Sequence, residues 1–123
     1  MDKKKILIVD DEKDWVQMLA MKLKSEGYQT EAAFDGIQAM MQVVQLEPNL
    51  ILLDIKMPAG GGLETLKHIR ASVKTFSTSV IVITGREDKE IKEAAEKLGI
   101  SGYFLKPVDM PQLLNRIKAV LSQ

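Results

Sequence analysis

The stretch "ILIVDDEKDW" (residues 6–15) runs four apolar residues directly into two adjacent aspartates, Asp10 and Asp11. A continuous apolar, β-branched run is typical of a parallel strand that is buried on both faces. Two neighbouring carboxylates repel each other unless a cation lies between them. The stretch therefore predicts a buried strand that delivers paired carboxylates to the edge of a sheet, together with a cation that compensates their charge.

Composition narrows the class of protein. The chain has 123 residues, which suits one domain that can bury a core without stabilising disulfides or metal ions. It contains no cysteine, which excludes a disulfide framework, a thiolate metal site and a cysteine nucleophile, and fits a reducing compartment. The 17 Lys and Arg residues equal the 17 Asp and Glu residues, so no overall charge attracts nucleic acid or an anionic membrane. No apolar run suits a signal peptide or a membrane span. We therefore expect a cytoplasmic location.

Five strand-like segments alternate with five segments of helical period. The predicted strands are residues 5–9, 28–32, 50–55, 79–84 and 102–105. The predicted helices carry apolar residues at or near i, i+3, i+4, i+7 spacing. These stripes are Val16, Leu19, Ala20 and Leu23; Ile37, Met40, Met41 and Val44; Leu63, Leu66, Ile69 and Val73; Ile91, Ala94, Ala95 and Leu98; and Leu113, Leu114, Ile117 and Val120. Asp35 and Asp109 are placed for helix N-caps, and Gly27 and Gly99 for C-caps.

This alternation predicts an α/β fold. We expect a five-stranded parallel sheet in the order 2-1-3-4-5, covered by five helices in a flavodoxin-like three-layer sandwich. No internal repeat or linker interrupts the pattern, so we expect a single domain over residues 1–123, with no output domain in this chain.

Polar residues follow four of the five predicted strands. Asp10 and Asp11 end the first, Asp54 the third, Thr84 the fourth and Lys106 the fifth. The second strand ends in "AAF", and in the order 2-1-3-4-5 it lies outside the other four. Ligands of open parallel sheets bind outside the carboxyl ends of the strands. We therefore expect these side chains to converge on one edge of the sheet.

This set of groups suits phosphoryl chemistry. Three close carboxylates cannot all stay ionised unless a cation compensates them or one takes up a proton. Mg²⁺ binds one or two carboxylates, keeps several waters and bridges to phosphate. Lys106 and Thr84 could then serve an incoming phosphoryl group, and a carboxylate can act as its acceptor.

From about residue 5 to residue 121 the chain resembles the receiver domain of two-component response regulators, including the chemotaxis regulators. The matching motifs are "VDD" (9–11), "LLDIKMP" (52–58) with Gly62 following, "VITG" (82–85) and "YFLKP" (103–107). Each motif alone is weak. In this order, and each at a strand end, they are specific together.

The resemblance assigns roles to individual residues. It implies Asp54 as the phosphoacceptor, and Asp10, Asp11, Asp54 and the backbone carbonyl of Lys56 as ligands of Mg²⁺, with Mn²⁺ as an alternative. It implies Thr84 and Lys106 as the phosphate-binding switch pair, Tyr103 as the aromatic switch, and a cis peptide bond between Lys106 and Pro107.

The implied function is that of a phosphoacceptor signalling module. A histidine kinase or histidine phosphotransfer protein would donate the phosphoryl group. The surface of the fourth helix, fifth strand and fifth helix would then bind a downstream protein or a second copy. The domain would catalyse only its own phosphorylation and dephosphorylation, and would bind neither nucleic acid nor a membrane directly.

The sequence departs from the family pattern near the acceptor. Lys56 lies two residues after Asp54, and Arg86 lies two residues after Thr84. Both positions flank the entrance for water and vary in the family, so we expect these two cations to alter the rate of dephosphorylation. The run "AGGG" (59–62) is also unusual, since an acid often precedes the family's glycine.

The sequence also leaves other functions open. A small phosphatase with an aspartate nucleophile would need a second acid at position 56, where the chain has lysine. A flavin or nucleotide binder would need a Gly-, Ser- or Thr-rich loop after the first strand, where "DDEKDW" is acidic. A receiver that binds partners without being phosphorylated is a further alternative.

Several residues have simpler explanations. One of the two adjacent aspartates could cap the first helix. His68 is expected to be a surface residue. Trp15, the sole tryptophan, is expected at the edge of the first helix and near the site.

Overall fold

The computed structural model describes residues 3–56 and 61–122. Its strands are β1 (Lys5–Val9), β2 (Gln29–Ala33), β3 (Leu50–Leu53), β4 (Ser79–Thr84) and β5 (Gly102–Leu105). Its helices are α1 (Lys13–Ser25), α2 (Gly36–Leu46), α3 (Gly62–Ala71), α4 (Lys89–Leu98) and α5 (Met110–Leu121). The strands pair in parallel in the order β2-β1-β3-β4-β5, which confirms the predicted sheet.

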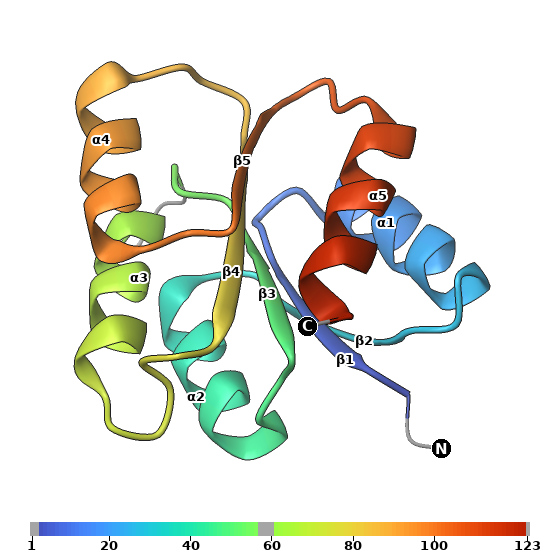
Figure 1. The fold of residues 1–123 in the computed structure, drawn as a ribbon, viewed down its shortest axis with the longest axis horizontal. Helices are drawn as coiled ribbons and strands as arrows, with labels where there is room; N and C mark the ends of the chain where they lie inside the picture. Colours follow the sequence, from blue (N-terminus) through green and yellow to red (C-terminus); the bar gives the residue numbers. More distant parts are fainter. Residues whose placement is uncertain (1–2, 57–60, 123) are drawn as a thin grey trace.

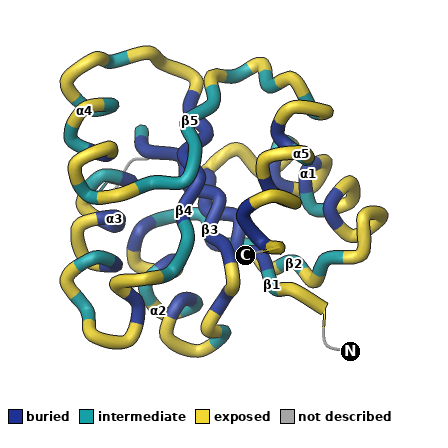
Figure 2. Tube along the Cα trace, in the orientation of Figure 1, coloured by how far each residue is buried: buried dark blue, intermediate teal, exposed yellow. Residues whose placement is uncertain are grey.

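The sheet is the middle of three layers. Helices α2, α3 and α4 cover one face, and α1 and α5 cover the other (Figure 1). Because successive side chains of a strand point to opposite faces, Leu7 and Val9 pack under α2–α4, whereas Ile6 and Ile8 pack under α1 and α5. The central strands are buried on both sides (Figure 2), which explains their unbroken apolar sequence.

The strand ends differ from the prediction by one or two residues. β2 begins at Gln29 rather than at residue 28, and β3 ends at Leu53 rather than at residue 55. The amide of Asp54 still donates to the carbonyl of Val9 (2.9 Å). The chain then leaves the ladder, and the side chain of Asp54 accepts a hydrogen bond from the amide of Lys56 in the loop that follows.

The predicted inner face of α2 is wrong. Gly36, Ala39 and Val43 are buried, whereas Ile37 is 71%, Met41 58% and Val44 55% exposed. Met40 alone of the predicted stripe packs partly against the core. Apolar residues occur on both sides of this helix, so periodicity fits either orientation. The small side chains of Gly36 and Ala39 let the helix approach the sheet closely.

The predicted stripe of α3 is wrong at one residue. α3 ends at Ala71, and Val73 lies in the following turn with 88% of its surface exposed. Ser72 at the C-cap is extended, and the hydroxyl of the buried Thr75 donates to the carbonyl of Ile69 (2.7 Å). The turn is therefore fixed by a polar contact that helical periodicity does not report.

The predicted helix ends agree closely with the structure. The side chains of Asp35 and Asp109 accept hydrogen bonds from the amides of Gln38 (2.8 Å) and Gln112 (3.1 Å) as N-caps. Gly99 is the C-cap of α4, with a φ of 95° that favours glycine. The C-cap of α1 is Glu26, so the predicted Gly27 lies one residue beyond it, also with a φ of 95°. Within the described residues, no helix has the length and apolar character that crossing a bilayer requires.

Arg70 joins three segments at the C-terminal ends of α3 and α4. Its guanidinium donates to the carbonyls of Leu98 (3.1 Å), Gly99 (2.9 Å) and Phe76 (3.0 Å). The last carbonyls of a helix lack partners within the helix. Arg70 therefore satisfies the end of α4 and ties it to α3 and to the loop before β4.

We expect Arg70→Ala to lower the free energy of unfolding by about 2 kcal/mol, because hydrogen bonds from a charged donor to several carbonyls are lost. Arg70→Lys should retain only part of the stability that Arg70→Ala loses, since an ammonium lacks the planar set of donors with which a guanidinium reaches several carbonyls. Lys67→Ala, an exposed change on the same helix, is the control and should cost less than about 0.5 kcal/mol. Urea unfolding measures all three. Equal stability of Arg70→Ala and the parent would contradict this role.

Candidate functional site

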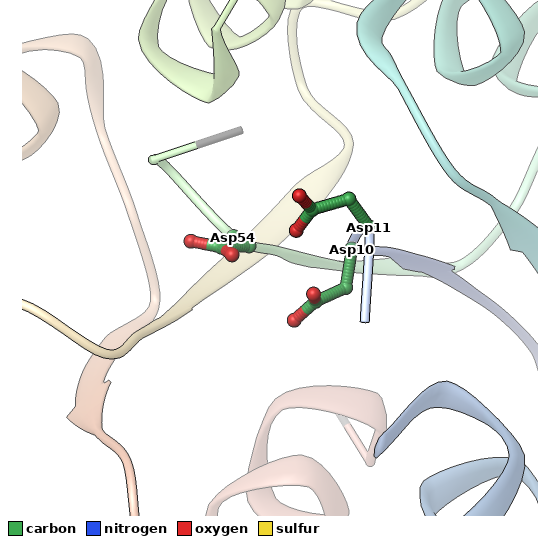
Figure 3. Close-up of side chains that lie close together, drawn as sticks. All are labelled: Asp10, Asp11 and Asp54. Carbon is green, nitrogen blue, oxygen red and sulfur yellow. The ribbon is translucent and has the colours of Figure 1, made fainter. Parts of the chain in front are cut away.

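Three carboxylates meet where β1 and β3 end. Asp10 and Asp11 follow β1, and Asp54 follows β3 (Figure 3). Each offers a carboxylate oxygen, and these oxygens lie within 4.8 Å of one another. Asp10 and Asp54 are buried, whereas Asp11 is exposed. The structure thus brings together the three aspartates that the sequence singles out.

Backbone amides hold the two buried aspartates in place. Asp54 Oδ1 accepts a hydrogen bond from the amide of Lys56 (3.0 Å), and Asp10 Oδ1 accepts one from the amide of Glu12 (2.9 Å). These short loops leave the second oxygen of each carboxylate for other partners. Asp54 Oδ2 lies 4.0 Å from Lys106 Nζ, which is beyond hydrogen-bond distance.

A glycine lets α3 approach Asp54. The amide of Gly62 donates to the carbonyl of Ile55 (3.1 Å). A Cβ atom at Gly62 would collide with the backbone carbonyl of Asp54. Glycine at this position therefore permits the backbone packing that places Asp54 at the edge of the sheet.

Lys106 is the cation of the site. Its ammonium bonds Asp10 Oδ2 (2.7 Å) and Glu12 Oε1 (2.9 Å), and its Nζ lies 5.3 Å from the centre of the Trp15 ring. The peptide bond from Lys106 to Pro107 is cis. Glu12 is not among the site residues predicted from the sequence. Its only signal was its position directly after the paired aspartates.

The charges of the site are unbalanced. The carboxylates of Asp10, Glu12 and Asp54 lie within 4.0 Å of the ammonium of Lys106, and the carboxylate of Asp11 joins those of Asp10 and Asp54 in the cluster. Burial raises the pKa of Asp54, and the amide of Lys56 and the charge of Lys106 only partly offset this. Burial likewise raises the pKa of Asp10 in spite of its bond to Lys106. The excess negative charge favours a bound cation.

The pKa of Lys106 is shifted in the opposite sense from the effect of burial. Burial by itself lowers it, but the bonds to Asp10 and Glu12 and the charge of Asp54 outweigh burial, so the pKa lies above its ordinary value. Lys106 therefore stays charged at neutral pH.

The donor set fits a hard divalent cation. The three clustered aspartates offer only oxygen, which is the ligand atom of Mg²⁺ and Mn²⁺. Asp11 is exposed, so the cluster opens to solvent on that side. These residues can therefore hold an ion that also keeps waters or binds a phosphoryl oxygen.

Thr84 lies on β4, next to β3, and Tyr103 lies on β5, next to β4. Thr84 ends β4 and is fully buried, and its Oγ1 accepts a long hydrogen bond from the amide of Arg86 (3.5 Å). Tyr103 on β5 is half-buried against the core beneath α4, and Lys92 Nζ lies 5.2 Å from the centre of its ring. Its buried hydroxyl has no hydrogen-bond partner among the described residues.

The two cations beside the site differ in their contacts. Lys56 Nζ forms an ion pair with Asp88 Oδ2 (3.4 Å), while Asp88 Oδ1 accepts from the amide of Ile91 and so caps α4. Arg86 is exposed. Asp88 is not among the residues predicted from the sequence, although an aspartate directly before a helical segment is an N-cap signal. The first two residues of the unusual "AGGG" run, 59 and 60, lie outside the described residues.

The simpler predictions have mixed outcomes. Trp15 is half-buried at the edge of α1, and His68 is exposed, as predicted. Neither adjacent aspartate is the N-cap of α1. That position is occupied by Glu12, whose side chain makes no capping bond because it pairs with Lys106 instead.

The sequence from residue 6 to residue 118 matches the family model of the response regulator receiver domain. The structure is similar to that of a CheY-like receiver domain protein from Methanospirillum hungatei, with 30% identity, a TM-score of 0.93, and 98% of this chain and 95% of that chain covered. A response regulator receiver protein from Pseudomonas putida is 30% identical with a TM-score of 0.92, over 97% of this chain and 98% of that chain.

A third similar structure is the chemotaxis protein CheY4 of Vibrio cholerae. It is 29% identical with a TM-score of 0.90, over 98% of this chain and all of that chain. The family match spans most of the sequence, and the fold agrees strand for strand with the expected sheet. This chain therefore belongs to the receiver-domain family of two-component response regulators.

Proposed function

We propose that this receiver domain is a phosphoacceptor signalling module in which Asp54 takes a phosphoryl group from a histidine kinase or a histidine phosphotransfer protein. One observation carries the proposal. Asp54 is buried beside two further carboxylates and a lysine, yet its Oδ2 forms no hydrogen bond with that lysine. This oxygen is positioned as a nucleophile.

The reaction is a group transfer to the domain's own side chain. Asp54 Oδ2 attacks phosphorus as the bond between phosphorus and the donor imidazole nitrogen breaks. The nitrogen keeps the electron pair of that bond, and Asp54 becomes an acyl phosphate. Water later attacks phosphorus, which releases inorganic phosphate and restores the carboxylate. The domain therefore catalyses only its own phosphorylation and dephosphorylation.

Asp10, Asp11, Asp54 and the backbone carbonyl of Lys56 would hold Mg²⁺, with Mn²⁺ as an alternative. When bound, the ion neutralises charge on the carboxylates and on the phosphoryl oxygens. The protein's own part is to fix these oxygens at the end of two central strands, where loop amides orient the carboxylates of Asp10 and Asp54.

The switch follows from the contacts of Lys106. A phosphoryl group on Asp54 adds negative charge close to Nζ, which draws the ammonium away from Asp10 and Glu12 and from the Trp15 ring. Thr84 can donate its hydroxyl to the same group. Tyr103 then shifts, because its hydroxyl has no partner among the described residues that would fix the ring.

The output surface would be formed by α4, β5 and α5, where a downstream protein or a second copy binds. The ion pair of Lys56 with Asp88 adds a direct link from the loop after Asp54 to the first turn of α4. We further propose that the domain works in the cytoplasm, where histidine kinases present their phosphoryl groups, and that it does not itself bind nucleic acid.

Adding acetyl phosphate and Mg²⁺ should raise the intact mass by one phosphoryl group and change the fluorescence of Trp15, because Lys106 leaves its ring. Asp54→Asn should show neither change. Intact-mass spectrometry and a fluorescence titration measure both. A phosphoryl group gained by Asp54→Asn would identify another acceptor, and an unmodified parent would favour a receiver that works without phosphorylation.

Without metal, Asp54→Asn should be more stable than the parent at neutral pH. The raised pKa of Asp54 means that the folded state binds this proton more tightly than the unfolded chain. The contribution of the ionised carboxyl is therefore unfavourable at neutral pH. It shrinks as the pH falls below the raised pKa of the folded state, and it is gone below the pKa of the unfolded chain. Thermal unfolding of both proteins at neutral and acidic pH tests this, with Asp14→Asn on the exposed start of α1 as control.

Mg²⁺ should make the parent more stable than Asp54→Asn. A ligand that binds only the folded state raises the free energy of unfolding by RT ln(1 + [L]/Kd). The parent should gain stability with Mg²⁺, and Asp54→Asn should gain much less. Equal stabilisation of both proteins by Mg²⁺ would argue against a site that includes Asp54.

We expect Lys56→Asn and Arg86→Glu to lose the phosphoryl group several-fold faster than the parent, because both side chains flank the approach of water to Asp54. Asp88→Asn keeps the positive charge of Lys56 but removes its ion-pair partner. This variant therefore distinguishes an effect of the charge of Lys56 from an effect of its ion pair with Asp88. Lys67→Asn is the control. Release of inorganic phosphate after removal of the donor gives each rate. Parent-like rates in Lys56→Asn and Arg86→Glu would refute this role.

A further inference from the structure

Helix α2 is apolar on its outer as well as its inner side. Ile37, Met41 and Val44, spaced i, i+4, i+7, point to solvent and form what we call the α2 stripe. A helix on the surface of a globular domain normally carries polar residues on its outer side. A contiguous exposed apolar patch marks a surface that another molecule covers.

The α2 stripe borders a groove between α2 and α3. The groove has a volume of about 510 Å³ and is lined by Ile37, Met40 and Met41 of α2 and by Glu64, Thr65 and His68 of α3. Its walls are mainly apolar, and two of its residues are methionines, which adapt their shape to a partner surface. The groove extends the apolar area beyond a single row of side chains.

The absence of charge on α2 indicates which partner covers it. Residues 36–46 include no Asp, Glu, Lys, Arg or His, although 28% of the chain is charged. Each of the other four described helices carries at least two charged side chains. In a two-fold interface, residues near the axis meet their own copies, so a charge there would face a like charge. A neutral apolar stripe is therefore self-complementary.

We propose that the α2 stripe is a self-association surface that binds the α2 stripe of a second copy of this chain. A two-fold axis across the middle of the helix sets the two copies of α2 antiparallel. This arrangement brings Ile37 of one copy near Val44 of the other, with Met41 close to the axis. The neutral side chains of Gln38, Gln42 and Gln45 flank the stripe and introduce no like-charge repulsion.

The expected association is weak. α2 has 11 residues, so it is about 16 Å long. One such helix with its groove gives an interface near or below about 1,200 Å², the size of transient complexes. The α2 stripe is also separate from the surface of α4, β5 and α5 (Figure 1). Association through α2 therefore needs no phosphoryl group on Asp54.

Sedimentation velocity without a phosphodonor, from micromolar to millimolar concentration, tests the proposal. The parent should show a weight-average mass that rises with concentration, and Met41→Glu should stay monomeric because two carboxylates would meet at the axis. Met21→Glu is the matched control: Met21 is 69% exposed on α1, on the opposite face of the sheet. It should associate as the parent does. Thermal unfolding checks that both variants fold.

A second test uses the absence of cysteine from the chain. Under a mild oxidant, Met41→Cys should form a disulfide-linked dimer much faster than Met21→Cys, because only position 41 lies at the proposed axis. Equal rates of cross-linking would overturn the proposal. A parent that stays monomeric at millimolar concentration would also overturn the proposal and would indicate that a different protein covers the α2 stripe. A Met41→Glu variant that associates like the parent would overturn it as well.

Discussion

The excess of negative charge at one edge of the sheet is the constraint on which the site depends. Asp10, Glu12 and Asp54 lie within 4.0 Å of the ammonium of Lys106, Asp11 adds a further carboxylate beside Asp10 and Asp54, and burial raises the pKa of both Asp10 and Asp54. The sheet tolerates this arrangement because its central strands are packed on both faces and hold the strand ends rigidly. The same excess of charge favours a bound divalent cation, on which the proposed phosphoryl transfer depends.

Lys106 connects this charge to the rest of the molecule. Its ammonium bonds the acids after β1 and lies over the ring of Trp15 on α1, although it belongs to the end of β5. Any change in the charge on Asp54 must therefore change the balance of forces on an element at the far edge of the sheet. The ion pair between Lys56 and Asp88 makes a second connection of this kind, from the loop after β3 to the start of α4.

The sequence predicted the sheet and the edge where the acids meet, because alternating strands and helices favour parallel pairing, and the polar ends of four strands favour the order 2-1-3-4-5. Prediction from the sequence was wrong where the apolar periodicity allows more than one orientation or end of a helix. On α2 the apolar residues fit either face, and the small side chains of Gly36 and Ala39 decided which one packs on the sheet. After α3, the hydrogen bond of Thr75 to Ile69 turned the chain and left Val73 exposed. Glu12 and Asp88 acquired partners 94 and 32 residues away, which no local pattern encodes.

What the sequence by itself determined is the set of chemical groups and the strand ends that carry them, because the central parallel strands have a continuous apolar pattern and four of the five strands are followed by a polar residue. What only the tertiary structure decided is which of these groups touch. Lys106 could have paired with Asp54, but in the fold it bonds Asp10 and Glu12 and leaves Asp54 Oδ2 without that bond. Distances of a few tenths of a nanometre between side chains depend on the packing of all three layers, and local sequence does not contain them.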